Sequence, residues 1–238
     1  MIWLFDLDNT LHNASVSIFP KISENMNAYF AEKYCAGGMV LTSEEADRFR
    51  IDFWKRFGAT LLGVSRIYNG DAREFLERAH RFDNLDSMVY AERGLIPLFR
   101  NLPGKKILLT NSARAYSKEV LRILGLLPYF DSHVPIESMR VHGKLEPKPS
   151  RKFFRKLLMR EKIRPSECIL VEDNAHILKV AKTLGMKTVL VTQYLNISRH
   201  SHHAYPVVQR KVPFSKPDYV DLKVSSVRQL TRRLNRIH

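Results

Sequence analysis

The chain of 238 residues contains very little cysteine and no long apolar run. Two isolated cysteines, Cys35 and Cys168, exclude a disulfide framework and a zinc site of several thiolates. A membrane-spanning helix needs about 20 consecutive apolar residues, and no stretch of this kind is present. The first residues are apolar but reach Asp6 and Asp8 without a preceding basic segment, unlike a signal peptide. We therefore expect a soluble, cytoplasmic protein without a membrane partner, in which Cys168 is a buried structural thiol.

Acidic residues are also scarce, because 24 Asp and Glu face 39 Lys and Arg, a net charge of +15. Part of the excess lies in residues 199–236, where the basic residues are opposed only by Asp218 and Asp221. Basic proteins often bind nucleic acid or anionic surfaces, but such side chains are also common on ordinary solvated surface. An anionic small substrate is compatible with the charge as well. The charge therefore does not choose between these alternatives.

Hydrophobic residues make up 45% of the chain, enough for a large core. Four short runs rich in Ile, Val and Leu are typical of buried parallel strands: residues 2–5, 106–110, 168–171 and 188–191. Three segments with helical periodicity accompany the later runs: residues 116–124, 151–162 and 177–184. This alternation predicts an α/β fold with a doubly wound parallel sheet and right-handed crossovers.

The first two predicted strands are too far apart in the sequence for a single crossover. Residues 15–92 show no convincing strand pattern, and amphipathic segments occur at 22–34, 43–57 and 71–80. The second of these opens with Ser43-Glu-Glu-Ala, which is similar to a helix capping box. We expect residues 15–92 to form an all-helical cap inserted after the first strand. Residues 1–14 and 93–238 would then form the core domain.

Two carboxylates follow the first predicted strand directly, in the motif FDLDNTL of residues 5–11. Burial of an unpaired carboxylate is costly, so Asp6 and Asp8 require a cation or a solvent-filled cleft. In open α/β sheets this cleft lies beyond the carboxyl ends of the strands. For this motif alone, a structural alternative is that Asp8 caps a turn and Asp6 pairs with a surface base.

The other predicted strands also end in polar side chains, which favours a shared site. Thr110 and Asn111 end the second run and can hold phosphate oxygens at a helix N-terminus. The third run ends in Glu172 and Asp173. Lys148 stands between two prolines, which restrict the backbone on both sides of it. One edge of the sheet would thus gather carboxylates, a hydroxyl and a lysine.

These elements, in this order, resemble the haloacid dehalogenase superfamily of phosphohydrolases over nearly the whole chain. The residues that match its four motifs are DLDNT at 6–10, Thr110, Lys148 and Glu172-Asp173. The helical insertion after the first motif matches the type of member whose cap follows strand one. Within the superfamily, the sequence in and around the motifs resembles the pyrimidine 5′-nucleotidase branch. The segments that carry this resemblance are WLFDLDNTLH at 3–12, AERGL at 91–95, TNSARAY at 110–116 and VEDN at 171–174.

The resemblance implies a magnesium-dependent phosphomonoester hydrolase that acts on nucleoside 5′-monophosphates, with pyrimidine ones favoured. Asp6 would be the nucleophile that forms an aspartyl-phosphate. Asp8 would protonate the leaving group and then activate water. Mg²⁺, a hard cation that prefers oxygen ligands, would be held by Asp6, the main-chain carbonyl of Asp8 and Asp173.

The resemblance also implies a phosphate-binding set of Thr110, Asn111 and Lys148, in which Lys148 restrains Asp6 as well. Glu172 would support these residues without contacting the metal or the substrate itself. Lys144 competes with Lys148 for the third motif, but the spacing to the helix that follows favours Lys148.

The fourth motif departs from the usual pattern. Members of the superfamily usually carry another polar residue about one helical turn after the metal-binding Asp173. Ile177 and Leu178 occupy that region here, so Asn174 or water would have to complete the metal shell.

The predicted cap must carry substrate specificity, because caps supply substrate contacts and exclude water. Residues 53–60 (FWKRFGAT) combine aromatic and basic side chains, which suits either base stacking or an ordinary core stripe with a charged face. We interpret His80 as structural. His200, His202 and His203 lie in residues 196–216, an expected loop, and without nearby acids or cysteines we assign them no metal.

Other functions remain open within and beyond this superfamily. A sugar-phosphate or other small-metabolite phosphatase would use the same motifs. Haloacid dehalogenation needs no magnesium and no second aspartate, so Asp8 and Thr10 argue against it. A basic nucleic-acid-binding protein without catalysis would leave the strand-end acids unexplained, because they repel a phosphate backbone. We therefore expect a small phosphorylated metabolite rather than nucleic acid as the partner; the sequence does not indicate the oligomeric state.

Overall fold

The computed structural model describes residues 1–33, 41–57, 59–67, 71–195, 215–233, 235 and 237. Cys35, the histidines at 200–203 and nearly all of the expected loop 196–216 lie outside the described residues. Among the residues that are described, no helix is both long and apolar enough to cross a membrane.

Six parallel strands form one sheet in the order β3-β2-β1-β6-β7-β8. In chain order these are β1 Ile2–Phe5, β2 Lys105–Leu109, β3 Ser132–Val134, β6 Cys168–Glu172, β7 Lys187–Val191 and β8 Leu222–Val224. The central strand β1 pairs with both β2 and β6, and Phe5 lies opposite Leu108 and Val171. Residues that follow these three strands therefore emerge side by side at one edge of the sheet.

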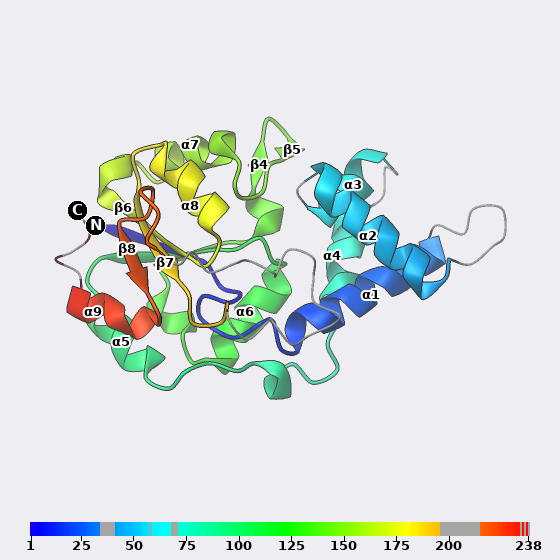
Figure 1. Ribbon diagram of the computed structural model, residues 1–238, viewed down its shortest axis with the longest axis horizontal. Helices are drawn as coiled ribbons and strands as arrows, with labels where there is room; N and C mark the ends of the chain where they lie inside the picture. Colours follow the sequence, from blue (N-terminus) through cyan, green and yellow to red (C-terminus); the bar gives the residue numbers. More distant parts are fainter. Residues whose placement is uncertain are drawn as a thin grey trace.

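Helices cover both faces of the sheet, as the alternating pattern predicted (Figure 1). The side chains of β1 alternate between two apolar clusters, with Trp3 and Phe5 in one and Leu4 in the other. The first cluster includes residues of α5 Leu95–Asn101, α6 Arg114–Ile123 and α9 Leu230–Arg233, and the second those of α7 Arg151–Arg160 and α8 Ala175–Lys182. The sheet is thus doubly wound, and the predicted fold class is confirmed.

The four apolar runs were predicted correctly as strands, whereas elements without an apolar run were missed. Each of the four predicted strands is present within one residue of its expected bounds. The edge strands β3 and β8 have three residues each and include polar side chains, so no apolar run marks them. The antiparallel hairpin of β4 Arg140–Val141 and β5 Lys144–Leu145 was not predicted either. The described residues also include the single-turn 3₁₀ helices η2 Asp86–Met88, η3 Leu127–Tyr129, η4 Ile136–Ser138, η5 Pro165–Glu167 and η7 Val227–Gln229.

Between β1 and β2, the described residues form helices and no strand. The insertion consists of α1 Ile18–Lys33, α2 Ser43–Phe57, α3 Thr60–Ile67 and α4 Ala72–Ala79, followed by η2 and α5. In Figure 1 helices α1–α4 pack together at one end of the molecule, beside the sheet domain. We call α1–α4 the helical insertion. An all-helical insertion after strand one is confirmed, while its domain limits at residues 15 and 92 stay a prediction.

The helical insertion has its own aromatic core. The ring of Phe30 lies 5.7 Å from that of Phe53, and the ring of Tyr29 lies 5.1 Å from that of Phe75. A capping box starts α2, but its capping residue is Thr42 rather than the expected Ser43. Thr42 Oγ1 accepts from the main-chain N–H of Glu45, whose carboxylate accepts from the N–H of Thr42 at 2.8 Å. The motif is therefore shifted by one residue.

Gly63 allows α3 to pack directly on α2. A Cβ atom at this position would lie 2.4 Å from Cδ2 of Phe53 and 2.8 Å from its Cβ. Alanine favours a helix over glycine by about 1 kcal/mol, but overpacking costs about 1–3 kcal/mol. Because the backbone and ring of Phe53 must both shift, we expect Gly63→Ala to be destabilising by about 1–2 kcal/mol, measured by denaturant unfolding. Ser65→Ala in the same helix is the control, and equal stability of the two variants would contradict this packing.

Candidate active site

Lys148 connects two acids that belong to neighbouring strands. Asp6 directly follows β1, and Glu172 is the last residue of β6. The ammonium group of Lys148 donates to Asp6 Oδ1 at 2.7 Å and to Glu172 Oε2 at 2.7 Å. These side chains are almost completely buried, with Glu172 only 1% exposed. The structure thus brings the predicted nucleophile and the predicted lysine into direct contact.

The side-chain amide of Asn111 forms both of its hydrogen bonds with the main chain of Lys148. Its Oδ1 accepts from the N–H of Lys148, and its Nδ2 donates to the Lys148 carbonyl, both at 2.9 Å. This reciprocal pair explains how a residue between two prolines is fixed in place. Lys144, the competitor for the third motif, lies exposed in β5. The phosphate-binding role predicted for Asn111 is therefore not visible in its side-chain contacts.

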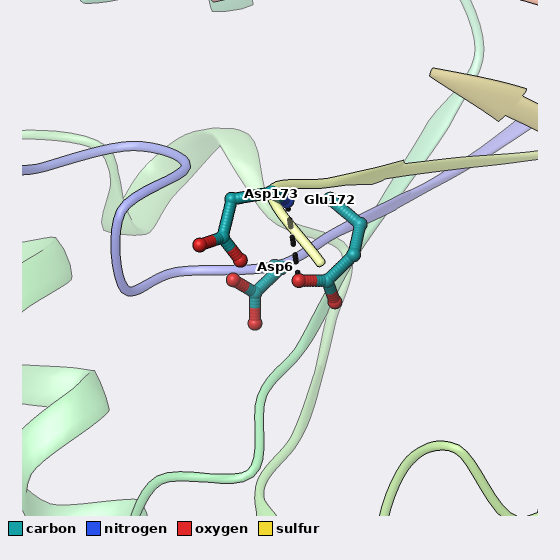
Figure 2. Close-up of side chains that lie close together, drawn as sticks. All are labelled: Asp6, Glu172 and Asp173. Atoms are coloured by element: carbon teal, nitrogen blue, oxygen red, sulfur yellow. Dashed lines mark hydrogen bonds between the residues drawn. The ribbon is translucent and has the colours of Figure 1, made fainter. Parts of the chain in front are cut away.

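A group of three acids could hold a divalent cation. Asp6, Glu172 and Asp173 each place a carboxylate oxygen so that the three oxygens lie within 4.8 Å of one another. Figure 2 shows the carboxylates of Asp6 and Asp173 directed toward each other, with Glu172 beside them. Buried carboxylates are the oxygen ligands that Mg²⁺ prefers, so the donor set fits this ion.

Both carboxylate oxygens of Glu172 accept hydrogen bonds from protein groups. Oε1 accepts from the main-chain N–H groups of Asp173 and Asn174, at 3.2 and 3.1 Å, while Oε2 accepts from Lys148. This geometry suits the role that the resemblance implied for Glu172, which is to support the metal-binding residues without holding the metal itself. The side chain of Asn174 caps α8 by accepting from the N–H of His176 at 3.0 Å. The alternative in which Asn174 completes the metal shell therefore finds no support in its contacts.

Ile177 and Leu178, about one helical turn after Asp173, are core residues. Ile177 is 5% exposed and Leu178 is fully buried in the cluster beneath α7 and α8. Their side chains pack inward and provide no polar atom to the site. The departure from the usual fourth motif therefore has a structural reason.

Asp8 is surrounded by hydrogen-bond donors that the sequence reasoning did not identify. His12 Nε2 lies 2.9 Å from Asp8 Oδ1, which also accepts from the hydroxyl of Tyr116 at 2.6 Å. Asp8 Oδ2 accepts from Ser112 Oγ at 2.5 Å. The i,i+4 spacing of Asp8 and His12 and the hydroxyls after Thr110 were the signals available in the sequence.

Two threonines complete the contacts among the predicted residues. Thr10 Oγ1 donates to Asp6 Oδ2 at 3.1 Å, so both oxygens of Asp6 have a partner. Thr110 is 1% exposed, and its Oγ1 accepts from the N–H of Ser112 at 3.0 Å. Asp6, Asp8, Thr110 and Lys148 thus gather at one edge of the sheet, as predicted.

The two motif aspartates have different charge environments. Burial and the neighbouring charge of Glu172 raise the pKa of Asp6 to about 7, against the opposing effect of Lys148. Burial also raises the pKa of Glu172 to about 7. Burial would raise the pKa of Asp8 as well, but its bonds with His12, Ser112 and Tyr116 outweigh this and lower it. For Lys148, the charges of Asp6 and Glu172 overcome burial and raise the pKa.

A family model described as haloacid dehalogenase-like hydrolase matches residues 2–185, which is most of the chain. The chain belongs to this family. The match spans β1 to the end of α8 and includes every residue of the site described above. The resemblance to the haloacid dehalogenase superfamily, inferred from the four motifs, is thereby confirmed.

Named relatives of this haloacid dehalogenase-like hydrolase have several activities. The sequence is 27% identical to pyrophosphatase PpaX of Bacillus mycoides, over 98% of this chain and 97% of that protein. Among solved structures, a HAD phosphatase from Thermococcus onnurineus matches with a TM-score of 0.58 and 19% identity, covering 98% and 97% of the two chains. L-2-haloacid dehalogenase from Xanthobacter autotrophicus matches with a TM-score of 0.57 and 15% identity, covering 100% and 99%. None of these three is named as a pyrimidine 5′-nucleotidase, so the narrower resemblance stays a prediction.

Magnesium is expected to stabilise this haloacid dehalogenase-like hydrolase more at pH 8 than at pH 5.5. The raised pKa values of Asp6 and Glu172 favour their protonated forms in the metal-free folded state. Because these pKa values are lower in the unfolded chain, protonation of Asp6 and Glu172 stabilises the metal-free folded protein at low pH. This stabilisation is lost as the pH rises through about 7. Metal binding requires ionised carboxylates, so it has the opposite pH dependence. The measurement is the difference in Tm between Mg²⁺ and EDTA at each pH.

Asp173→Asn is the control for this pH series, because it removes one acid of the group and should reduce the Mg²⁺ effect at every pH. An equal Mg²⁺ effect at pH 5.5 and pH 8 in the unmodified protein would contradict metal binding by Asp6 and its neighbours.

Proposed function

We propose that this protein is a magnesium-dependent phosphomonoester hydrolase with Asp6 as its nucleophile. The observation that carries the proposal is the contact of Lys148 with Asp6, next to a second acid, Asp173, that can share a cation with Asp6. A lysine that neutralises the nucleophile and a metal beside it allow an anionic phosphate to approach a carboxylate.

Each residue then has a defined step. A carboxylate oxygen of Asp6 attacks phosphorus, forming the aspartyl-phosphate while the bond to the leaving oxygen breaks. Lys148 and Thr110 hold the phosphoryl oxygens. Asp6, Asp173 and the main-chain carbonyl of Asp8 would hold Mg²⁺, which when bound would neutralise negative charge in the transition state.

Asp8 moves the protons in this scheme. It protonates the leaving oxygen in the first step, then accepts a proton from the water that attacks the aspartyl-phosphate. Its lowered pKa in the free protein suits the second step, in which it acts as a base. Arrival of an anionic phosphate raises the proton affinity of a neighbouring carboxylate, which suits the first step.

The proposed substrates are nucleoside 5′-monophosphates, with pyrimidine ones favoured. The support is that the sequence in and around the four motifs resembles the pyrimidine 5′-nucleotidase branch. The aromatic and basic residues 53–60 do not add support for base stacking. Phe53 is 6% exposed within the core of the helical insertion, and the guanidinium of Arg56 lies over the ring of Phe57 at 5.4 Å. This segment matches the alternative interpretation, a core stripe with a charged face.

Hydrolysis of inorganic pyrophosphate or another small phosphorylated metabolite is the second candidate. The relative that supports it is PpaX, which is named a pyrophosphatase and is similar over nearly the full length of both chains. Dehalogenation is disfavoured because it needs no acid–base aspartate, and here Asp8 has three buried partners. Catalysis-free binding of nucleic acid leaves the buried acids at the strand ends without a purpose.

Asp6→Asn is expected to lower kcat for a generic aryl phosphate by about 10⁴-fold or more, the scale seen when other enzymes lose a nucleophile. Asp8→Asn should lower kcat by about 10²–10⁴-fold, as expected for general acid–base catalysis. Phosphate release in the presence of Mg²⁺ is the measurement. Asp218→Asn, at an exposed position outside the site, is the control. Full activity of Asp6→Asn would rule out the mechanism.

A phosphate-release screen separates the substrate classes. Nucleoside 5′-monophosphates, sugar phosphates and inorganic pyrophosphate are compared by kcat/KM, with Mg²⁺ and with EDTA. We expect pyrimidine nucleotides to give the highest kcat/KM and EDTA to remove activity on all substrates. Preference for a sugar phosphate would reject the nucleotidase assignment but keep the phosphatase one, and preference for pyrophosphate would select the second candidate.

A further inference from the structure

Tyr116 contacts both Asp8, in the candidate active site, and residues at the end of the helical insertion. It lies in the first turn of α6, is 3% exposed, and its hydroxyl donates to Asp8 at 2.6 Å. Its ring also contacts two residues that follow α4. The ring of His80 lies 5.3 Å from that of Tyr116 and the ring of Phe82 lies 5.5 Å from it, both tilted.

His80 is tied to α4 by its main chain and its side chain. It is the C-cap residue, and its N–H donates to the carbonyl of Leu76 at 3.1 Å, while the N–H of the next residue, Arg81, donates to the carbonyl of Arg78 at 3.3 Å. Nδ1 of its ring lies 3.0 Å from the Leu76 carbonyl and, as the donor, bonds to it. Both the main chain and the ring of His80 are thus bonded to the last turn of α4. A displacement of α4 relative to the sheet domain would move this ring against Tyr116.

We infer that Tyr116 is a positioning residue through which the end of α4 holds the carboxylate of Asp8 in place. This inference rests on the proposed role of Asp8 in phosphate transfer. His80 and Phe82 pack against the Tyr116 ring, and the hydroxyl of that ring bonds to Asp8 Oδ1. Packed rings transmit a displacement because interiors are close-packed and have few alternative arrangements.

The contacts favour this role over a direct contact of His80 with substrate. Aromatic pairs at these separations are attractive beyond their buried area, so the three rings form one packed unit. His12 and Ser112 bind Asp8 from within the sheet domain, since both lie outside the helical insertion. Of the three side chains that bond to the Asp8 carboxylate, Tyr116 is the one whose ring contacts His80 at the end of α4.

A double-mutant cycle on an aryl phosphate tests the inference. Tyr116→Phe keeps the ring and removes the hydrogen bond to a charged carboxylate, so kcat should fall about tenfold or more while KM stays within about twofold. His80→Leu removes the ring contact and should lower kcat about two- to tenfold. If His80 acts through the hydroxyl of Tyr116, His80→Leu should have no further effect on kcat in the Tyr116→Phe background.

His80→Phe is the second variant, because it keeps an aromatic ring but no polar group. It should restore kcat to within about twofold of the unmodified protein if ring packing is what matters. Independent, multiplicative effects of the two substitutions, or a His80→Phe variant as slow as His80→Leu, would overturn the inference. Those results would indicate that His80 contacts the substrate itself.

Two control variants separate this coupling from general damage. Tyr194→Phe removes another buried hydroxyl, one that accepts from the N–H of Glu92 outside the site, and should leave kcat unchanged. Phe49→Leu breaks a ring pair with Phe53 within the helical insertion, at 6.0 Å, and should also leave kcat unchanged. Absence of phosphatase activity in the unmodified protein would reject the proposed function instead, so the two failures are distinguishable.

Discussion

The contact of Lys148 with Asp6 and Glu172 is the interaction on which the site depends. Two buried carboxylates at the ends of adjacent strands repel each other, and each loses several kcal/mol of hydration on burial. The lysine compensates part of this cost, and its main chain is fixed by the side-chain amide of Asn111. The sheet places the acids, and the ammonium group of Lys148 between them lowers the cost of burying them.

The features that the sequence predicted are those with a strong local cause. β1 and most of β6 are continuous apolar runs, which are typical of buried parallel strands. Because carboxyl ends of neighbouring parallel strands meet, the acids after those runs had to converge once the strands were recognised. Lys148 was preferred over Lys144 from the spacing to α7, and the structure places Lys148 against Asp6 while Lys144 is exposed.

The features that were missed depend on contacts between distant residues. β3 and β8 become strands because a neighbouring strand offers backbone partners, and their polar residues give no apolar signal. Asn111 looked like a phosphate ligand because an amide can bond equally well to phosphate or to a main chain. Only the folded chain shows that the main chain of Lys148 takes both ends of the amide.

Asp6 and Asp8 lie two residues apart, yet their surroundings push their pKa values in opposite directions. Asp6 shares one lysine with a second acid, and burial raises its pKa to about 7. Asp8 accepts from three side chains, and its pKa is lowered. Such opposed environments separate a nucleophile from an acid–base group. A divalent cation beside Asp6 would favour its ionised form, so burial would make the reactivity of this proposed nucleophile depend on the proposed metal.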